Sequence, residues 1–178
     1  MKYIELIIMA IGLSMDAFSL SIVYGTRMLN KKIQRFLSIT VGIFHFIMPI
    51  LGSIIGNFIV NYIIPNPDNL VGIIFLILSI EMLLNIKDLD KEKKDFKNLF
   101  DAFLFGFSVS IDSFSVGIAL GSHNKNIIVS GIFFSTISFL FTYFGLTLGE
   151  KLTIKFGKIA NVIGSILLLV LSITYFLE

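Results

Sequence analysis

Six long apolar segments follow one another along this chain, and they constrain its fold more than any other feature. They cover residues 3–25, 36–62, 70–86, 100–121, 127–149 and 159–176. A helix needs about 20 apolar residues to cross the hydrocarbon core of a bilayer. Because a helix also satisfies its own backbone hydrogen bonds there, we predict an all-α integral membrane protein with six transmembrane helices.

The composition agrees with a membrane protein and excludes an ordinary soluble domain. Hydrophobic residues make up 56% of the chain and charged residues 15%, with a mean hydropathy of +0.93, whereas about a quarter of a soluble domain is charged. The first segment lacks the basic start and cleavage site of a signal peptide, so we expect it to be retained. The chain has no cysteine, which excludes disulfides and thiolate metal sites.

The basic residues predict an orientation in the membrane. Of the 14 Lys and Arg residues, all but Lys2 and Lys125 lie in the first, third and fifth intervals between the apolar segments. Lys and Arg in short loops favour the cytoplasmic side. We therefore expect both termini of this multi-pass protein to lie outside.

The first and fourth segments repeat one short pattern. Residues 14–25 and 110–121 are identical at six of twelve positions, and the identities include Asp16 with Asp112. A weaker match relates the second segment to the fifth. Chance similarity between two apolar, serine-rich helices is the alternative, and the shared aspartate counts against it.

The repeat divides the chain into two halves. We expect a three-helix repeat at residues 1–86, a charged cytoplasmic linker at residues 87–97 and a second three-helix repeat at residues 98–178. The mixed charges of the linker are typical of a solvated loop. The first and fourth helices would cross the membrane in opposite directions, which makes the repeats inverted. Inverted repeats recur in secondary transporters, whose substrate sites lie near the midplane between the halves.

Two carboxylates inside apolar helices require an explanation. An acidic residue at the centre of a membrane helix costs roughly 2.5 to 3.5 kcal/mol on insertion scales and usually marks an ion pathway or a partner. With a rise of ~1.5 Å per residue, antiparallel helices would place Asp16 and Asp112 within ~5 Å of one depth. Because two close carboxylates repel unless a proton or a cation neutralises them, we expect the pair to bind a divalent cation.

Other side chains near the aspartates are further candidate ligands. Residues three or four apart share a helix face, which places Ser19 beside Asp16, and Ser108 and Ser115 beside Asp112. Oxygen ligands suit Mg, Ca or Mn ions and do not separate Mn from Mg. Three softer candidates lie on the first and second helices: Met15, His45 and Met48.

Small residues predict where membrane helices approach closely. They recur at a spacing of four on the first and fourth helices, and the members are Ala17, Ser21 and Gly25, and Ser113, Gly117 and Gly121. We therefore expect the first and fourth helices to cross near the two aspartates.

The second and third helices add polar candidates. Pro49 has no N–H and should kink the second helix, which leaves a free carbonyl near His45; Gly52 and Gly56 follow it. His45 could then be a gate or a ligand, or it could simply be hydrogen-bonded across helices. Glu81 could take part in transport, or it could reach water or a loop lysine at the end of the third helix.

Three stretches carry a resemblance to a known family, and they read "GLSMDAF", "FHFIMPILGSIIG" and "SIDSFSVGIALG". They resemble the bacterial manganese efflux pump family MntP, and the similarity extends over nearly the whole chain. "YGTRML" also resembles the related sporulation membrane protein YtaF. The resemblance implies six spans, two repeats and two transport aspartates, which correspond to Asp16 and Asp112. His45 and Glu81 depart from the family pattern, which affects metal specificity more than the transport class.

We therefore expect an exporter of divalent cations in the bacterial plasma membrane, with Mn(II) as the transported substrate and no permanently bound cofactor. Alternating access around the two aspartates would move the ion, and protons are a candidate counter-ion. We expect no nucleic-acid partner and no enzymatic activity, and the chain has no ATP-binding GxxxxGK[ST] loop. Two alternatives stay open, a non-transporting scaffold or sporulation-type paralogue, and an intramembrane aspartyl protease, although Asp112 does not follow the GxG of such proteases.

Overall fold

The computed structural model describes residues 3–26, 29–62, 67–87, 89, 99–122, 126–151 and 153–177. Within these ranges the chain is all-helical, and the helices are α1 (Tyr3–Gly25), α2 (Lys31–Tyr62), α3 (Pro67–Asn85), α4 (Leu99–Val109), α5 (Ile111–Ser122), α6 (Ile127–Gly149) and α7 (Ile154–Leu177). They provide six spans long and apolar enough to cross a membrane, because α4 and α5 together make one span. This confirms the predicted all-α fold with six spans.

Parts of the sequence-based predictions lie outside the described residues. They include the predicted linker at residues 87–97, of which only residues 87 and 89 are described, and the two basic residues Lys2 and Lys125. The repeat boundaries and the orientation in the membrane therefore stay predictions.

Observed and predicted helix bounds agree for two helices and differ at the start of three others. The helices α1 and α6 have the predicted bounds, whereas α2 begins at Lys31, α3 at Pro67 and α7 at Ile154, each a few residues earlier than predicted. Hydropathy detects only the apolar part of a helix, and the hydrogen-bonded turns continue into the polar flank. The Oδ1 atom of Asn30 caps α2 by accepting a hydrogen bond from the N–H of Lys32 at 3.0 Å.

The fourth span is broken, which its apolar pattern did not predict. Helix α4 ends at Val109 and α5 begins at Ile111, with Ser110 between them. The hydroxyl of Ser110 donates to the carbonyl of Gly106 at 2.7 Å, and its N–H donates to the carbonyl of Phe107 at 3.2 Å. Serine side chains compete with helical backbone bonds in this way. The break gives α5 its own N-terminus inside the span.

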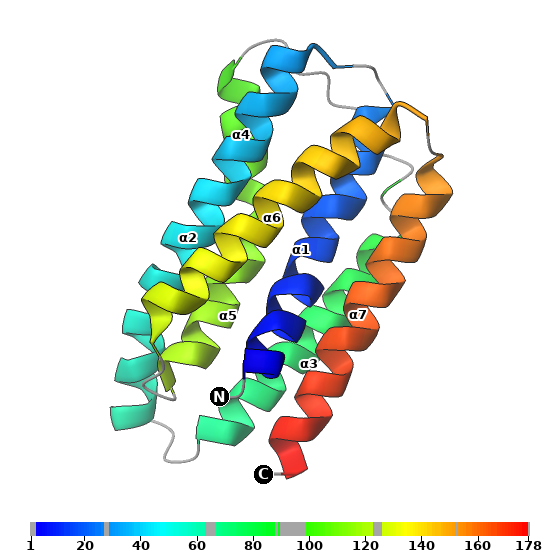
Figure 1. Cartoon of the computed structure of the whole chain (residues 1–178). Coiled ribbons are helices and arrows are strands. Elements are labelled where there is room, and N and C mark those ends of the chain that lie inside the picture. The colour runs from blue at the N-terminus through cyan, green and yellow to red at the C-terminus, as the bar shows by residue number, and fades with distance from the viewer. Residues whose placement is uncertain are drawn as a thin grey trace.

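Helix α1 lies in the middle of the bundle and packs against α6 and α7 (Figure 1). Helix α2 packs against α4, α5 and α6, and α3 packs against α5 and α7. The predicted close crossing of the first and fourth helices at the aspartates is wrong, because in the described ranges neither α4 nor α5 is a close-packed neighbour of α1. The two spans do touch through Tyr24 of α1 and Phe105 of α4, whose ring centroids are 4.8 Å apart. A stripe of small residues indicates a close approach, but it does not identify the partner helix.

The small residues instead allow close packing of α1 on α6 and of α2 on α5. A Cβ atom on Gly25 would overlap the backbone of Leu146 in α6, and a Cβ atom on Gly117 would overlap the backbone of Pro49 in α2. Only glycine allows these helix backbones to come so close. The other predicted packing residues are all buried, and they are Ala17, Ser21, Gly52, Gly56, Ser113 and Gly121.

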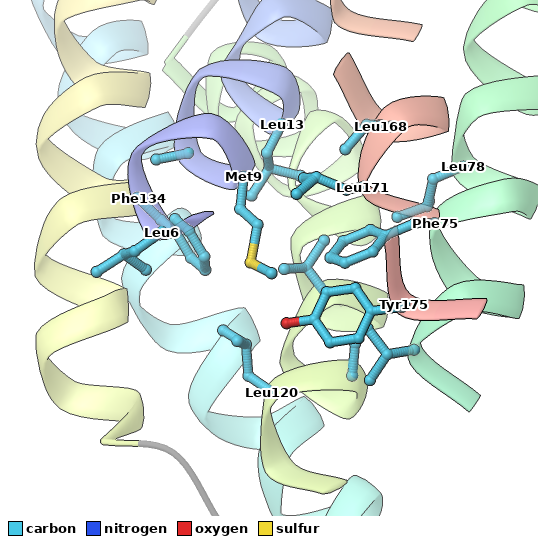
Figure 2. Close-up of a cluster of buried hydrophobic side chains, with 14 of the residues drawn as sticks. Leu6, Met9, Leu13, Phe75, Leu78, Leu120, Phe134, Leu168, Leu171 and Tyr175 are labelled. Carbon is cyan, nitrogen blue, oxygen red and sulfur yellow. The ribbon is translucent and has the colours of Figure 1, made fainter. Parts of the chain in front are cut away.

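An apolar cluster fills the half of the bundle that holds the start of α1 and the end of α7. Figure 2 shows side chains of this cluster from several helices, among them Leu6, Met9, Phe75, Phe134 and Tyr175. Met9, Phe75 and Phe134 are fully buried, and the rings of Phe75 and Tyr175 are 5.9 Å apart. Apolar side chains therefore cover any polar site in the middle of the bundle from this side.

Candidate metal site

A small cavity lies between α1, α3, α5 and α7. Its volume is about 40 Å³, which is room for a few water molecules or for an ion with part of its hydration shell. Three carboxylates line it, from Asp16, Glu81 and Asp112. The other lining residues are Gly12, Leu78, Met82, Asn85 and Leu168. Both predicted aspartates thus lie at one cavity, although their helices are not close-packed neighbours.

Asp112 lies in the first turn of α5, directly after the break at Ser110. Its Oδ1 atom accepts a hydrogen bond from the backbone N–H of Ser113 at 2.8 Å. The free N–H groups at a helix N-terminus carry partial positive charge, which stabilises a nearby carboxylate. The break therefore explains how the fourth span accommodates an acidic side chain.

Asp16 is held in a different way, because it lies within the unbroken helix α1. Its side chain is half-buried. One turn earlier, Gly12 lies so close to α7 that a Cβ atom there would be 3.1 Å from Leu168. With no helix N-terminus beside it, the charge of Asp16 depends on what fills the cavity.

Glu81 approaches the aspartates from the last turns of α3. The sequence left it open whether this side chain reaches water, a loop lysine or the transport site, and the structure places it in the cavity wall. No three His, Cys, Asp or Glu side chains of the described residues already converge as a metal cage. An ion at this site would therefore keep some of its water or draw in hydroxyl and carbonyl oxygens.

None of the predicted serine ligands belongs to the cavity wall that the structure describes. The hydroxyl of Ser19 is buried and donates to the carbonyl of Gly157 in α7 at 2.7 Å. Ser108 is exposed and donates to the carbonyl of Leu104 at 2.8 Å, and Ser115 is half-buried. A shared helix face is not sufficient, because a serine hydroxyl readily bonds a nearby backbone carbonyl. Their part in ion binding stays a prediction.

His45 lies at the break in the fourth span. Its Nδ1 atom is 3.0 Å from the carbonyl oxygen of Val41 and 2.9 Å from the Oγ atom of Ser110. The ring is fully buried, and its Nε2 atom has no hydrogen-bond partner in the part of the chain that the structure describes. The cross-helix hydrogen bond, one of the two interpretations of His45, is therefore present.

The two predicted methionine ligands occupy packing positions. A Cβ atom on Gly164 of α7 would lie 2.6 Å from the Cβ atom of Met15, and Met48 is buried on α2. Helix α2 continues through Pro49 without a break. Both methionines lie outside the described cavity wall, and packing is an ordinary role for methionine in a protein interior.

An ion pair joins the start of α2 to the residue after α6. The Nζ atom of Lys31 is 2.7 Å from the Oε1 atom of Glu150, and the side chain of Gln34 donates to the same oxygen at 2.8 Å. These hydrogen bonds, with that from Lys31 the larger cause, hold the pKa of Glu150 below its usual value. Because the pair is solvent-exposed, it contributes little to stability.

Reasoning from the sequence did not single out Gly12 or Asn85, which belong to the cavity wall. A signal existed for both residues. Gly12 lies four residues before Asp16, and Asn85 lies four residues after Glu81, which is about one helical turn in each case. Extending each acidic position by one turn in both directions would have found them.

Comparison with known proteins agrees with a membrane transporter. A family model described as "Mntp: Putative manganese efflux pump" matches residues 27–176. A protein of Bacillus thuringiensis (strain Al Hakam) named "Putative manganese efflux pump MntP" is 34% identical over 172 residues, which cover 94% of this chain and 92% of the relative. A protein of Bacillus mycoides (strain KBAB4) with the same name is 36% identical over 168 residues, with the same coverage. No solved structure matches the chain. The chain belongs to the MntP family.

Proposed function

We propose that this chain exports divalent cations, with Mn(II) as the transported substrate, and that Asp16 and Asp112 bind the ion near the middle of the membrane. The strongest support is a cavity within a six-span bundle whose wall contains three carboxylates. The printed names of the relatives support manganese as the cargo.

The charges in the cavity favour a divalent cation. Two ionised aspartates neutralise such an ion, and the attraction is much stronger in a low-dielectric interior than in water. Carboxylate oxygens are preferred ligands of Mg, Ca and Mn, and Asn85 adds an amide oxygen to the wall. Glu81 is exposed, so we place it at the mouth of the cavity, where it attracts cations.

The positions of polar and apolar side chains support alternating access. The apolar cluster that contains Phe75 and Tyr175 lies on the side of the cavity where α1 begins. Glu81 and Asn85 are exposed and lie toward the other side, near the predicted cytoplasmic linker. We infer a state whose cavity faces the cytoplasm. Export then requires the two halves to rock until the apolar cluster opens.

The pattern of helix contacts supports two inverted repeats. In two such repeats, α1 corresponds to α5, α2 to α6 and α3 to α7. The α1–α6 pair then corresponds to the α5–α2 pair, and the α1–α7 pair to the α5–α3 pair. All four pairs are close contacts. A Cβ atom on Gly149 would overlap the carbonyl oxygen of Ile22 in the same way as one on Gly56 would overlap the carbonyl oxygen of Ile118. We propose that the repeats move as units and that protons, binding the aspartates on the outer side, act as counter-ions.

The same proposal places the chain in the bacterial plasma membrane with both termini outside, as the distribution of Lys and Arg predicts. It assigns both aspartates to ion binding and none to catalysis, so the chain is a transporter and not an enzyme.

Manganese accumulation in cells tests the proposal. The wild type should lower cellular manganese, and Asp16→Asn and Asp112→Asn should abolish the effect at equal membrane abundance, because each removes one of the two charges that balance the ion. Glu81→Gln should weaken export by about tenfold, as expected for a group that supports the ligands. Glu5→Gln, at the start of α1 and outside the described cavity wall, is the control.

If the wild type and both aspartate variants leave cellular manganese alike, manganese export is not the function. If another divalent ion changes instead, the site stands and only the cargo is wrong. Unchanged levels of every divalent ion would favour a scaffold.

A further inference from the structure

Asn161 on α7 is a buried polar side chain that the proposed site does not use. It is fully buried, and neither its Nδ2 atom nor its Oδ1 atom has a hydrogen-bond partner among the described residues. An amide buried without partners destabilises a protein, and such groups ordinarily bind a water molecule or an ion. The surroundings of Asn161 decide which of these is expected.

The packing of α7 on α1 sets the level at which Asn161 lies. A Cβ atom on Gly157 would be 3.0 Å from the carbonyl oxygen of Ser19, and one on Gly164 would be 2.6 Å from the Cβ atom of Met15. The two helices therefore touch at both ends of a short stretch, in which α1 contributes residues 16–18.

Asn161 shares a face of α7 with both of these glycines, because it lies four residues after the first and three before the second. It therefore lies on the face of α7 that packs on α1, at the level of residues 16–18. Met82 of α3 also contacts Gly164, and Met82 lines the cavity. The long, flexible side chain of Met82 could rotate and extend the cavity toward the amide.

We propose that Asn161 is a further ligand of the transported cation, with its amide oxygen binding the ion beside Asp16. This rests on the proposed function, because the ion is the one that the two aspartates hold. Carbonyl oxygens of Asn are ordinary ligands of hard divalent cations. A neutral ligand also adds an oxygen atom without adding charge to a cavity that already contains three carboxylates.

The α1–α6 interface offers a matched control. The Oγ1 atom of Thr142 in α6 is buried and has no partner in the described ranges, as for the amide of Asn161. Thr142, like Asn161, lies outside the described cavity wall, but its helix α6 contributes no residue to that wall, whereas α7 contributes Leu168. Thr142→Val therefore removes an unpaired buried oxygen without changing α7.

Binding of Mn²⁺ to the purified full-length protein, measured by titration calorimetry together with the melting temperature of the metal-free protein, tests the inference. Asn161→Leu should raise the Kd for Mn²⁺ by about tenfold or more. Its melting temperature should stay the same or rise, because an unpaired polar group has been replaced by an apolar one. Asn161→Asp should bind at least as tightly as the wild type, and Thr142→Val should leave the Kd unchanged.

The same titration with Asp16→Asn separates the two proposals. If Asp16→Asn loses Mn²⁺ binding and Asn161→Leu binds like the wild type, the amide holds only water and the inference is overturned while the proposed function stands. If Asp16→Asn also binds like the wild type, the aspartate site itself is wrong. Should Asn161→Leu fail to fold, Asn161→Ala takes its place with the same two outcomes.

Discussion

The two aspartates come from matching stretches of sequence but lie in different local structures. Asp16 lies inside the unbroken helix α1, whereas Asp112 opens α5 directly after the break at Ser110. Asp112 therefore has a helix N-terminus that stabilises its charge, and Asp16 does not. Equivalent sequence positions thus contribute two unlike carboxylates to one cavity.

The residues around the two matching serines explain the difference. Ser14 follows Ala10 by four residues, whereas Ser110 follows Gly106 by four residues. The hydroxyl of Ser14 pairs with that of Ser138 in α6 at 2.7 Å, whereas the hydroxyl of Ser110 donates to the carbonyl of Gly106 at 2.7 Å. Glycine is about 1 kcal/mol less favourable than alanine in a helix. The fourth span is therefore easier to break than the first.

The largest expected effect is on the stability of the fold. It comes from a feature that the two aspartate-containing helices α1 and α5 share, which is close packing on a partner helix. Gly25→Val and Gly117→Val would each place a side chain in the backbone of α6 or α2. Overpacking of this kind destabilises a protein by about 3 kcal/mol. We expect both variants to lose most of their folded protein, measured as membrane yield and melting temperature.

Gly131→Ala is the control for this packing, because its Cβ atom would meet the ring of Phe46 at 3.1 Å, and that side chain can shift. A Gly117→Val protein as stable as this control would contradict the close approach of α2 and α5.

A smaller effect, on Mn²⁺ binding, should distinguish the region of Asp112 from that of Asp16. Ser110→Ala removes the bond to Gly106 and a partner of His45, and Ser14→Ala removes only the bond with Ser138. Each change should destabilise the fold by about 1 kcal/mol. Only Ser110→Ala should also weaken Mn²⁺ binding, by about tenfold, because the break positions Asp112. Equal Kd values for the two variants would mean that the break has no part in positioning this carboxylate.

The smallest expected effect, on thermal stability, comes from an ion pair outside both aspartate regions. Lys31 and Glu150 form this pair and join α2 to the end of α6. The hydrogen bonds from Lys31 and Gln34 lower the pKa of Glu150 from its usual 4.5. A carboxyl group with a lowered pKa stabilises the fold above its usual value, and this contribution disappears as the pH falls through the lowered value. Glu150→Gln should therefore melt slightly below the wild type at pH 7 and together with it in strong acid.

Melting curves recorded against pH and salt check this expectation. High salt should remove the difference at pH 7, because exposed charges are screened. A difference that grows on acidification would show that the ion pair is not its cause.

Part of the fold and of the candidate site could be predicted from the sequence. The ends of α1 and α6 match because each lies at a glycine followed by polar residues, which is a typical helix stop signal. The aspartates were recognisable because a membrane rarely tolerates them. The positions of Ser19 and Ser108 could not be predicted, since each hydroxyl bonds a backbone carbonyl. Glu81 was ambiguous because its surroundings depend on how α3 packs.

The sequence by itself determined the number of spans and the acidic residues within them, because the bilayer requires long apolar helices and makes every charge conspicuous. Only the tertiary structure decided which helices are neighbours, where the fourth span breaks, and that Glu81 lies near the aspartates. Helices in a membrane associate through close packing and hydrogen bonds rather than through hydrophobic burial. Those contacts join residues far apart in the chain, so a pattern along one helix does not identify its partner.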